Sequence, residues 1–128
     1  MSKQLPNELR YTNEHEWLKV DGDHAILGIT DHAQELLGDI VFVELPELNA
    51  SYNKSETIGV IESVKAASDV YAPITGTIIE VNPELESNPD FINQDPYQQG
   101  WLCKIKIKDS SELDQLLTAE QYQDLIKD

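Results

Sequence analysis

The chain has little sulfur and little positive charge, and both shortages exclude broad classes of function. Cys103 is the only cysteine among 128 residues, which rules out an internal disulfide, a paired-cysteine redox site and a cysteine-rich structural zinc site. Nine Lys and Arg residues stand against 24 Asp and Glu residues, so the formal charge is −15. Because nucleic acids and anionic membrane surfaces attract cationic proteins, we expect neither as a partner.

Long apolar runs and an N-terminal targeting pattern are also missing. No stretch approaches the ~18 apolar residues of a membrane span, and the opening residues MSKQLPNELR lack the basic and apolar regions of a signal peptide. We therefore expect a cytoplasmic protein. The acidic residues divide equally between 1–64 and 65–128, and the length suits one modest core, so residues 1–128 are expected to form a single domain.

Short β-rich runs punctuated by Gly, Pro and Asn predict a small sandwich or barrel over about residues 11–108. The segments predicted to be strands are 16–20, 24–30, 40–45, two strands within 57–70, 77–82 and 101–108. Residues 82–100 hold three of the six prolines and predict an irregular surface connection with one helical turn near Glu84. Leucines and aromatics at helical spacing predict one or two helices at about 110–127, with Thr118 among the candidate caps.

A short helix is predicted over residues 30–38. Thr30 or Asp31 can cap its N-terminus and Gly38 can end it. Its apolar stripe is expected to consist of Ala33, Leu36 and Leu37. The other side chains expected in the core include Trp17, Phe42, Trp101 and an inert Cys103.

The distribution of positive charge singles out Lys65. It is the only basic residue between Lys54 and Lys104, a stretch that holds eight acidic residues. A Schiff-base lysine needs a lowered pKa, whereas Glu62 and Asp69 favour the charged form of this lysine. An attachment point for a carrier group instead needs exposure, small neighbours and a rigid two-stranded support, which this segment offers. The alternative is an ordinary surface lysine.

The residues around Lys65 resemble the lipoylation hairpin of the glycine cleavage system H proteins, relatives of the lipoyl domains. The hairpin match consists of Glu62-Ser63-Val64-Lys65-Ala66 followed by 68–76. The further matching segments, in order, are Tyr11-Thr12 with His15-Glu16-Trp17, 28–34, 37–39, 41–46, Asn93 with Asp95-Pro96-Tyr97, and Gly100-Trp101 with 104–106. The chain departs from the family pattern at Asn49-Ala50, where a glycine turn is usual, and at Leu36, where some members have a histidine facing the lipoyl cleft.

The resemblance implies a mainly β, lipoyl-domain-like barrel-sandwich hybrid with short peripheral helices and a C-terminal helical segment. It implies a carrier without catalytic residues, in which lipoate is attached covalently to Lys65. The resemblance implies three partners in glycine cleavage. The P protein (glycine decarboxylase) loads an aminomethyl group, the T protein (aminomethyltransferase) removes its methylene carbon, and the L protein (dihydrolipoyl dehydrogenase) reoxidises the arm. It also implies lipoate-attaching enzymes as partners. We expect a monomer.

The resemblance also implies a pocket for the loaded arm, whose terminal amine is cationic near neutral pH. Glu16, Asp31 and Asp69 match the acidic positions at that end of the family's domain. Carboxylates would stabilise an ammonium group through charge-assisted hydrogen bonds. For Asp31 a helix cap is an equal alternative. The three histidines show no metal-ligand spacing, so no metal site is expected.

Other functions stay open at this point. Within the family the runner-up is a relay that passes lipoate from Lys65 to other lipoyl proteins. A biotinyl domain would carry methionines where Val64 and Ala66 stand, and the acyltransferase of a 2-oxoacid dehydrogenase would need a longer chain. A hydrolase with paired carboxylates lacks a motif that brings two acids together. A structural interaction module would leave Lys65 unmodified.

Overall fold

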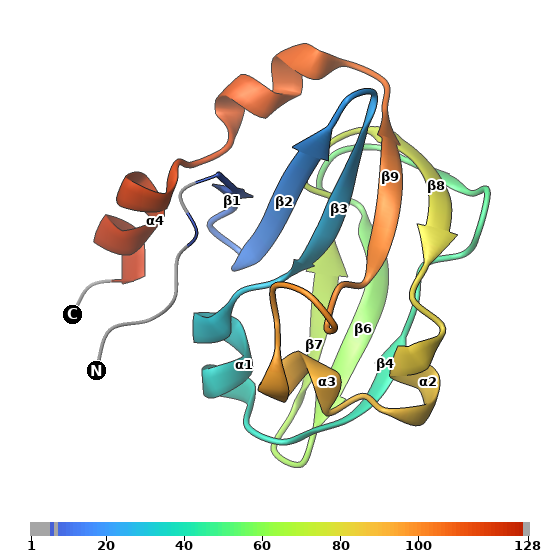
Figure 1. Cartoon of the computed structure of the whole chain (residues 1–128), viewed down its shortest axis with the longest axis vertical. Coiled ribbons are helices and arrows are strands. Elements are labelled where there is room, and N and C mark those ends of the chain that lie inside the picture. Colours follow the sequence, from blue (N-terminus) through green and yellow to red (C-terminus); the bar gives the residue numbers. More distant parts are fainter. Residues whose placement is uncertain (1–5, 7, 127–128) are drawn as a thin grey trace.

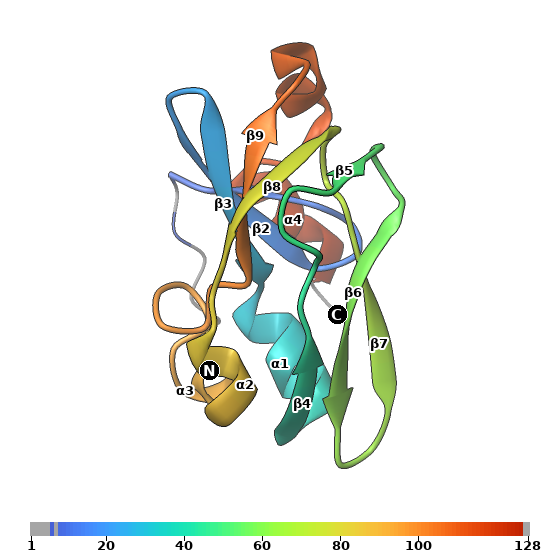
Figure 2. The same ribbon diagram turned by 90° about the vertical axis from the view of Figure 1, so that its right-hand side faces the viewer.

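The computed structural model describes residues 6 and 8–126 and consists of two antiparallel sheets that face one another (Figures 1 and 2). The larger sheet has the strand order β1-β2-β3-β9-β8-β5 and the smaller sheet has the order β4-β6-β7. The larger sheet contains β1 (Arg10–Tyr11), β2 (Glu16–Asp21), β3 (His24–Ile29), β9 (Cys103–Ile107), β8 (Gly76–Val81) and β5 (Ser51–Tyr52). The smaller sheet contains β4 (Ile40–Glu44), β6 (Thr57–Ser63) and β7 (Ala67–Tyr71). The predicted mainly β fold is confirmed, although the sheets do not close into a barrel.

The hairpin of β2 and β3 follows the predicted boundaries closely. Gly22 sits in its turn with φ +68°, a left-handed conformation that glycine adopts without strain. Across the two strands Trp17 is paired with Gly28. A Cβ added to Gly28 would lie 2.5 Å from the Trp17 ring, so glycine at this position makes room for the buried indole.

Helix α1 (Asp31–Leu37) confirms the predicted short helix and identifies its cap. The Thr30 hydroxyl accepts a hydrogen bond from the Ala33 backbone N–H, so Thr30 is the N-cap and Asp31 is the first helical residue. Gly38 ends the helix with φ +81°. The predicted apolar stripe is wrong at Leu36, which is exposed because it lies on the helix face turned away from the core.

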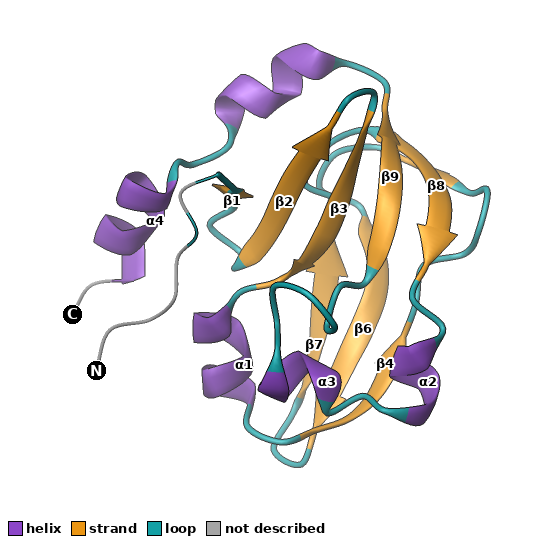
Figure 3. Cartoon of the chain, viewed as in Figure 1, coloured by secondary structure: helices purple, strands orange, loops and turns teal. Residues whose placement is uncertain are grey.

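The prolines and polar residues of 82–100 contain two short helices, α2 (Glu84–Ser87) and α3 (Phe91–Gln94). The first confirms the helical turn expected near Glu84, and the second was not predicted. Figure 3 shows that α1, α2 and α3 lie at the same end of the sheets as the turn between β6 and β7. The three helices therefore frame the end of the molecule that carries Lys65.

The C-terminal segment forms the 3-10 helix η1 (Ser110–Gln115) and α4 (Ala119–Ile126). The Thr118 side chain accepts a hydrogen bond from the Gln121 backbone N–H, which confirms Thr118 as a cap. Tyr122 of α4 is fully buried and its ring stacks on that of Tyr11 at 4.9 Å between centroids. Residue 127, the last of the predicted helical segment, lies outside the described residues. None of the described helices has the length and apolar character needed to cross a lipid bilayer.

Two of the four expected core side chains are not fully buried. Phe42 is half exposed, because an irregularity in the β4 register between Ile40 and Phe42 turns its ring outward. Trp101 is only partly buried. Trp17 and Cys103 are buried as predicted, and burial raises the pKa of the Cys103 thiol to about 12, which makes it unreactive.

Candidate functional site

Lys65 is exposed at the apex of the β6–β7 hairpin, and the turn that presents it is held by Ser63. The Ser63 N–H donates to the Ala66 carbonyl at 2.8 Å. The Ser63 hydroxyl accepts from the N–H groups of Lys65 and Ala66 at 3.2 and 3.1 Å, and donates to the Ala66 carbonyl. A serine hydroxyl that bonds to nearby backbone groups stabilises a tight turn. The apex is therefore ordered although it projects into solvent.

The apex rests against the turn between α1 and β4. The Val64 N–H donates to the Asp39 carbonyl at 3.0 Å. The Lys65 side chain lies across Gly38, and its Cε is only 3.2 Å from the position that a Cβ on Gly38 would take. Glycine is thus suited to this turn both by its positive φ and by the space that it leaves for the lysine stem.

The side chain of Asn93, in α3, stabilises the turn between α1 and β4 through hydrogen bonds. Its side-chain oxygen accepts from the Ile40 N–H at 2.9 Å, and its side-chain nitrogen donates to the Gly38 carbonyl at 2.9 Å and to Gln34 Oε1 at 2.8 Å. A chain of hydrogen bonds therefore connects α3 through the α1–β4 turn to the backbone beside Lys65.

Glu16 lies at the start of β2 and is almost completely buried, with 2% of its surface exposed. Its Oε1 accepts a hydrogen bond from the Thr12 hydroxyl at 2.8 Å, and its Oε2 accepts from the Tyr71 N–H at 2.9 Å. Burial raises the pKa of this carboxyl to about 7, and the hydrogen bonds from Tyr71 and Thr12 limit the rise. Glu16 can therefore change charge near neutral pH.

A cavity of about 350 Å³ lies beside Glu16. Its lining residues come from β1 to β2, the loop between β5 and β6, the end of β7 and the segment before α4: Tyr11, Thr12, Asn13, Glu14, Glu16, Lys54, Ser55, Tyr71, Ala72, Pro73, Gln115, Leu116 and Leu117. The ammonium of Lys54 donates a hydrogen bond to the side chain of Gln115. The cavity thus combines a buried carboxyl with one lysine that is already engaged.

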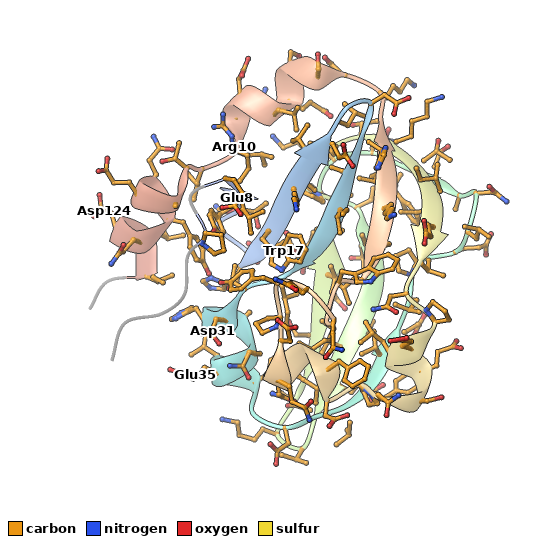
Figure 4. The ribbon with its side chains drawn as sticks, in the orientation of Figure 1. Glu8, Arg10, Trp17, Asp31, Glu35 and Asp124 are labelled. Carbon is orange, nitrogen blue, oxygen red and sulfur yellow. The ribbon has the colours of Figure 1, made fainter. Side chains whose placement is uncertain are left out.

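The other two predicted pocket residues lie outside this cavity. Asp31 stands on the outer side of α1, as does Glu35 (Figure 4), and its carboxylate accepts a hydrogen bond from Gln34 Nε2 at 2.8 Å. Asp31 is nevertheless close to Glu16 in the fold, because Glu16 pairs across strands with Ile29, which is two residues before Asp31. Asp69 is exposed on β7, two residues before Tyr71.

Lys65 and Glu16 sit near opposite ends of β7. At about 3.3 Å per residue, the chain from Lys65 to Tyr71 extends over roughly 20 Å. Glu16 bonds to the far end of that stretch. The lysine side chain alone therefore does not reach the Glu16 cavity, whereas a group that lengthens it along β7 would approach the cavity.

Two contributors to the Glu16 environment had no signal in the sequence. Thr12 carries no signal beyond its place in a segment that resembles the family, yet its hydroxyl orients the carboxyl, helped by a turn in which His15 has φ +73°. Tyr71 contributes its backbone N–H, which every residue except proline possesses. Among the described residues no group of three or more His, Cys, Asp or Glu side chains is arranged to bind a metal ion.

Comparisons of the sequence and of the structure with known proteins indicate the same protein family. The family model described as glycine cleavage H-protein matches residues 9–128. The chain belongs to the glycine cleavage H-protein family. It is 52% identical over 122 residues to the glycine cleavage system H protein of Staphylococcus carnosus (strain TM300), covering 95% of this chain and 97% of the relative. It is 53% identical over 123 residues to that of Geobacillus sp. (strain WCH70), covering 96% and 97%.

A solved structure agrees with these relatives. The crystal structure of a glycine cleavage system H protein from Mycobacterium marinum matches with a TM-score of 0.86 at 39% identity, covering 93% of this chain and 96% of that one. Membership makes the chain a lipoyl carrier component of the glycine cleavage system rather than a catalytic enzyme, with covalently attached lipoate as its cofactor. Its partners are enzymes of that system.

Proposed function

We propose that Lys65 is the residue that bears lipoate, and that the chain carries the aminomethyl group of glycine from the P protein to the T protein, with the L protein reoxidising the arm. The observation that supports this proposal most is the setting of Lys65. The lysine is exposed, its stem lies against Gly38, and the adjacent Val64 is hydrogen-bonded to Asp39. An amide bond at Nζ would therefore disturb no packed group and break no hydrogen bond among the described residues.

Lipoate, when attached, supplies a disulfide that accepts and releases the aminomethyl group through its sulfur atoms. The chain itself has no pair of thiols that could replace the lipoyl disulfide, because Cys103 is its only cysteine and is buried. The contribution of the chain is to hold the attachment point still, through Ser63 and the α1–β4 turn, and to offer a site for the cationic amine.

Glu16 is the proposed contact of that amine. An ammonium group in the cavity would favour the ionised carboxylate and would lower its pKa from about 7. The Tyr71 N–H and the Thr12 hydroxyl already orient the two oxygens. Asp31 and Asp69 are proposed to add negative charge along the approach, since both lie near the same end of β2 and β7 but outside the cavity.

The hairpin residues Glu62, Ser63, Val64 and Ala66 are proposed as the local structure that the lipoate-attaching enzyme recognises. We further propose one domain over residues 1–128, a cytoplasmic location and a monomer, because a charge of −15 opposes self-association. Limited proteolysis, cell fractionation and sedimentation test these three points. A dimer at micromolar concentration would refute the last one.

The carrier proposal is tested by intact-mass analysis and peptide mapping after expression in a host that supplies lipoate. We expect one lipoyl-sized increment on the Lys65 peptide and none in Lys65→Arg. The loaded wild-type protein should then restore glycine cleavage with the three purified partners, and the variant should not. If a lipoyl ligase supplied with lipoate leaves Lys65 bare, the proposal fails.

A further inference from the structure

Four large apolar side chains are exposed around the hairpin apex. Leu36 of α1 is 58% exposed, Val41 and Phe42 of β4 are 53% and 50% exposed, and Val64 at the apex is 68% exposed. We call these four residues the apex patch. A cluster of large apolar side chains exposed together marks an interaction site more often than single exposed residues do.

Register and hydrogen bonds place the apex patch next to Lys65. Phe42 is paired with Glu62 and Ile40 with Ser63, so β4 runs alongside the strand that leads to the apex. Leu36 lies in the last turn of α1, two residues before Gly38, which touches the Lys65 stem. The irregularity in β4 turns both Val41 and Phe42 outward, where a regular strand would bury one of them.

Acidic side chains form a rim around the apex patch. Asp39, Glu44, Glu62 and Asp69 are all exposed, and Glu62 stands directly opposite Phe42 across the strands. None of the four forms an ion pair with any residue that the structure describes. A partner that covers the apex patch would therefore gain from lysine and arginine side chains around an apolar centre.

We propose that the apex patch is the docking surface for the enzyme that attaches the lipoyl group, a partner with an apolar contact surface ringed by basic side chains. This inference rests on the proposed function of Lys65. The attaching enzyme acts on Nζ itself, so its active site must come within bonding distance of the apex and must cover the residues beside it. Enzymes that act on the far end of an attached arm work at a distance from these residues.

The attachment step makes the close approach necessary. A lipoyl carboxyl activated as a mixed anhydride with a nucleotide is attacked by the deprotonated Nζ of Lys65. The new bond joins Nζ to the acyl carbon, the bond from that carbon to the nucleotide oxygen breaks, and the lysine ammonium loses two protons in total. Nζ lies beside Gly38, so the reacting carbonyl must arrive next to the apex patch.

The experiment compares initial rates of lipoylation, followed by intact mass with a purified lipoyl ligase, lipoate and ATP. We expect kcat/KM to fall at least tenfold in Phe42→Ser and in Val64→Ser, as for the loss of buried anchors at an interface. The matched control is Leu48→Ser: Leu48 is 51% exposed but lies beyond the opposite end of β4. Its rate should stay within twofold of wild type.

Folding and charge are tested separately. Val64 lies in the exposed turn, so Val64→Ser should retain the wild-type unfolding temperature even if Phe42→Ser is destabilised. Glu44→Gln should lower kcat/KM at low salt and reduce its decline with added salt. Wild-type rates for Phe42→Ser and Val64→Ser would overturn the docking proposal alone, whereas failure of the wild-type chain to be lipoylated would overturn the carrier function itself.

Discussion

The backbone N–H of Tyr71 donates a 2.9 Å hydrogen bond to Oε2 of Glu16, so a carboxyl on β2 links the larger sheet to β7 at the edge of the smaller one. The bond satisfies a donor on an edge strand, where an unpaired N–H group would otherwise be free to pair with another chain. It also holds a carboxyl with a pKa of about 7 beside the cavity proposed to receive the amine. Glu16 thus both stabilises the packing of the two sheets and supplies the negative charge of the proposed amine site.

The raised pKa of Glu16 gives the stability a specific dependence on pH. Between the ordinary glutamate pKa of 4.5 and about 7, the folded state retains a proton that the unfolded state has lost, so this group makes unfolding easier as the pH rises through that window. The full effect is about 3 kcal/mol at most. We expect Glu16→Gln to remove it, which would appear as a smaller loss of unfolding free energy between pH 4.5 and 7 in urea titrations. If the unfolding free energies of the wild type and Glu16→Gln depended on pH in the same way, the raised pKa of Glu16 would be contradicted.

Removing the Glu16 carboxyl should also weaken retention of the bound amine. In Glu16→Ala the aminomethyl-loaded carrier loses its proposed charge-assisted contact, so we expect methylamine to be released several-fold faster near pH 7.5. Glu86→Ala is the control, because Glu86 is exposed on α2, away from the cavity. Release is followed by mass spectrometry of the loaded protein. An unchanged rate in Glu16→Ala would remove Glu16 from the site.

The fold was predictable wherever the sequence carries local turn and cap signals. Gly22 and Gly38 adopt the positive φ values that their positions suggested, and Thr30 caps α1. The exposed apex was predictable as well, because small residues flank Lys65 between two β-rich runs. These features depend on the conformational preferences of a few neighbouring residues, which the sequence displays directly.

What could not be predicted depends on contacts between distant segments. The sequence of β4 alternates poorly, and only its pairing with β6 shows the irregularity that exposes Phe42. The two-residue strands β1 and β5 are too short to show a periodicity and exist because longer strands pair with them. Likewise, the bond between Glu16 and Tyr71 uses a backbone group 55 residues away and leaves no mark in the sequence.

Asn93 should control the order of the turn that supports Lys65. Asn93→Ala would leave the Ile40 N–H and the Gly38 carbonyl without their side-chain partner, and we expect a loss of about 1–3 kcal/mol in unfolding free energy. Amide exchange should accelerate at Ile40 and Val64, which depend on that turn. The control is Asn88→Ala, since Asn88 is exposed and bonds through its backbone. Unchanged exchange at Val64 would show that the apex is ordered without Asn93.

The Tyr122 hydroxyl should determine how firmly α4 is held. It lies 2.8 Å from His15 Nδ1 and 2.8 Å from Thr30 Oγ1, and the ring stacks on Tyr11. Tyr122→Phe preserves the stacking but leaves the buried Thr30 hydroxyl and the partly buried His15 Nδ1 without this partner. We therefore expect a loss of about 1–3 kcal/mol and faster amide exchange in α4.

Tyr52→Phe is the matched control for Tyr122→Phe, because the Tyr52 hydroxyl has no hydrogen-bond partner among the described residues. Acid should loosen α4 in the same way as the substitution. Burial, reinforced by His32, lowers the pKa of His15 below 6.5, so the unfolded state takes up a proton first and this group favours unfolding as the pH falls below 6.5. Exchange in α4 that is equally slow in Tyr122→Phe and in the wild type would show that stacking on Tyr11 alone secures the helix.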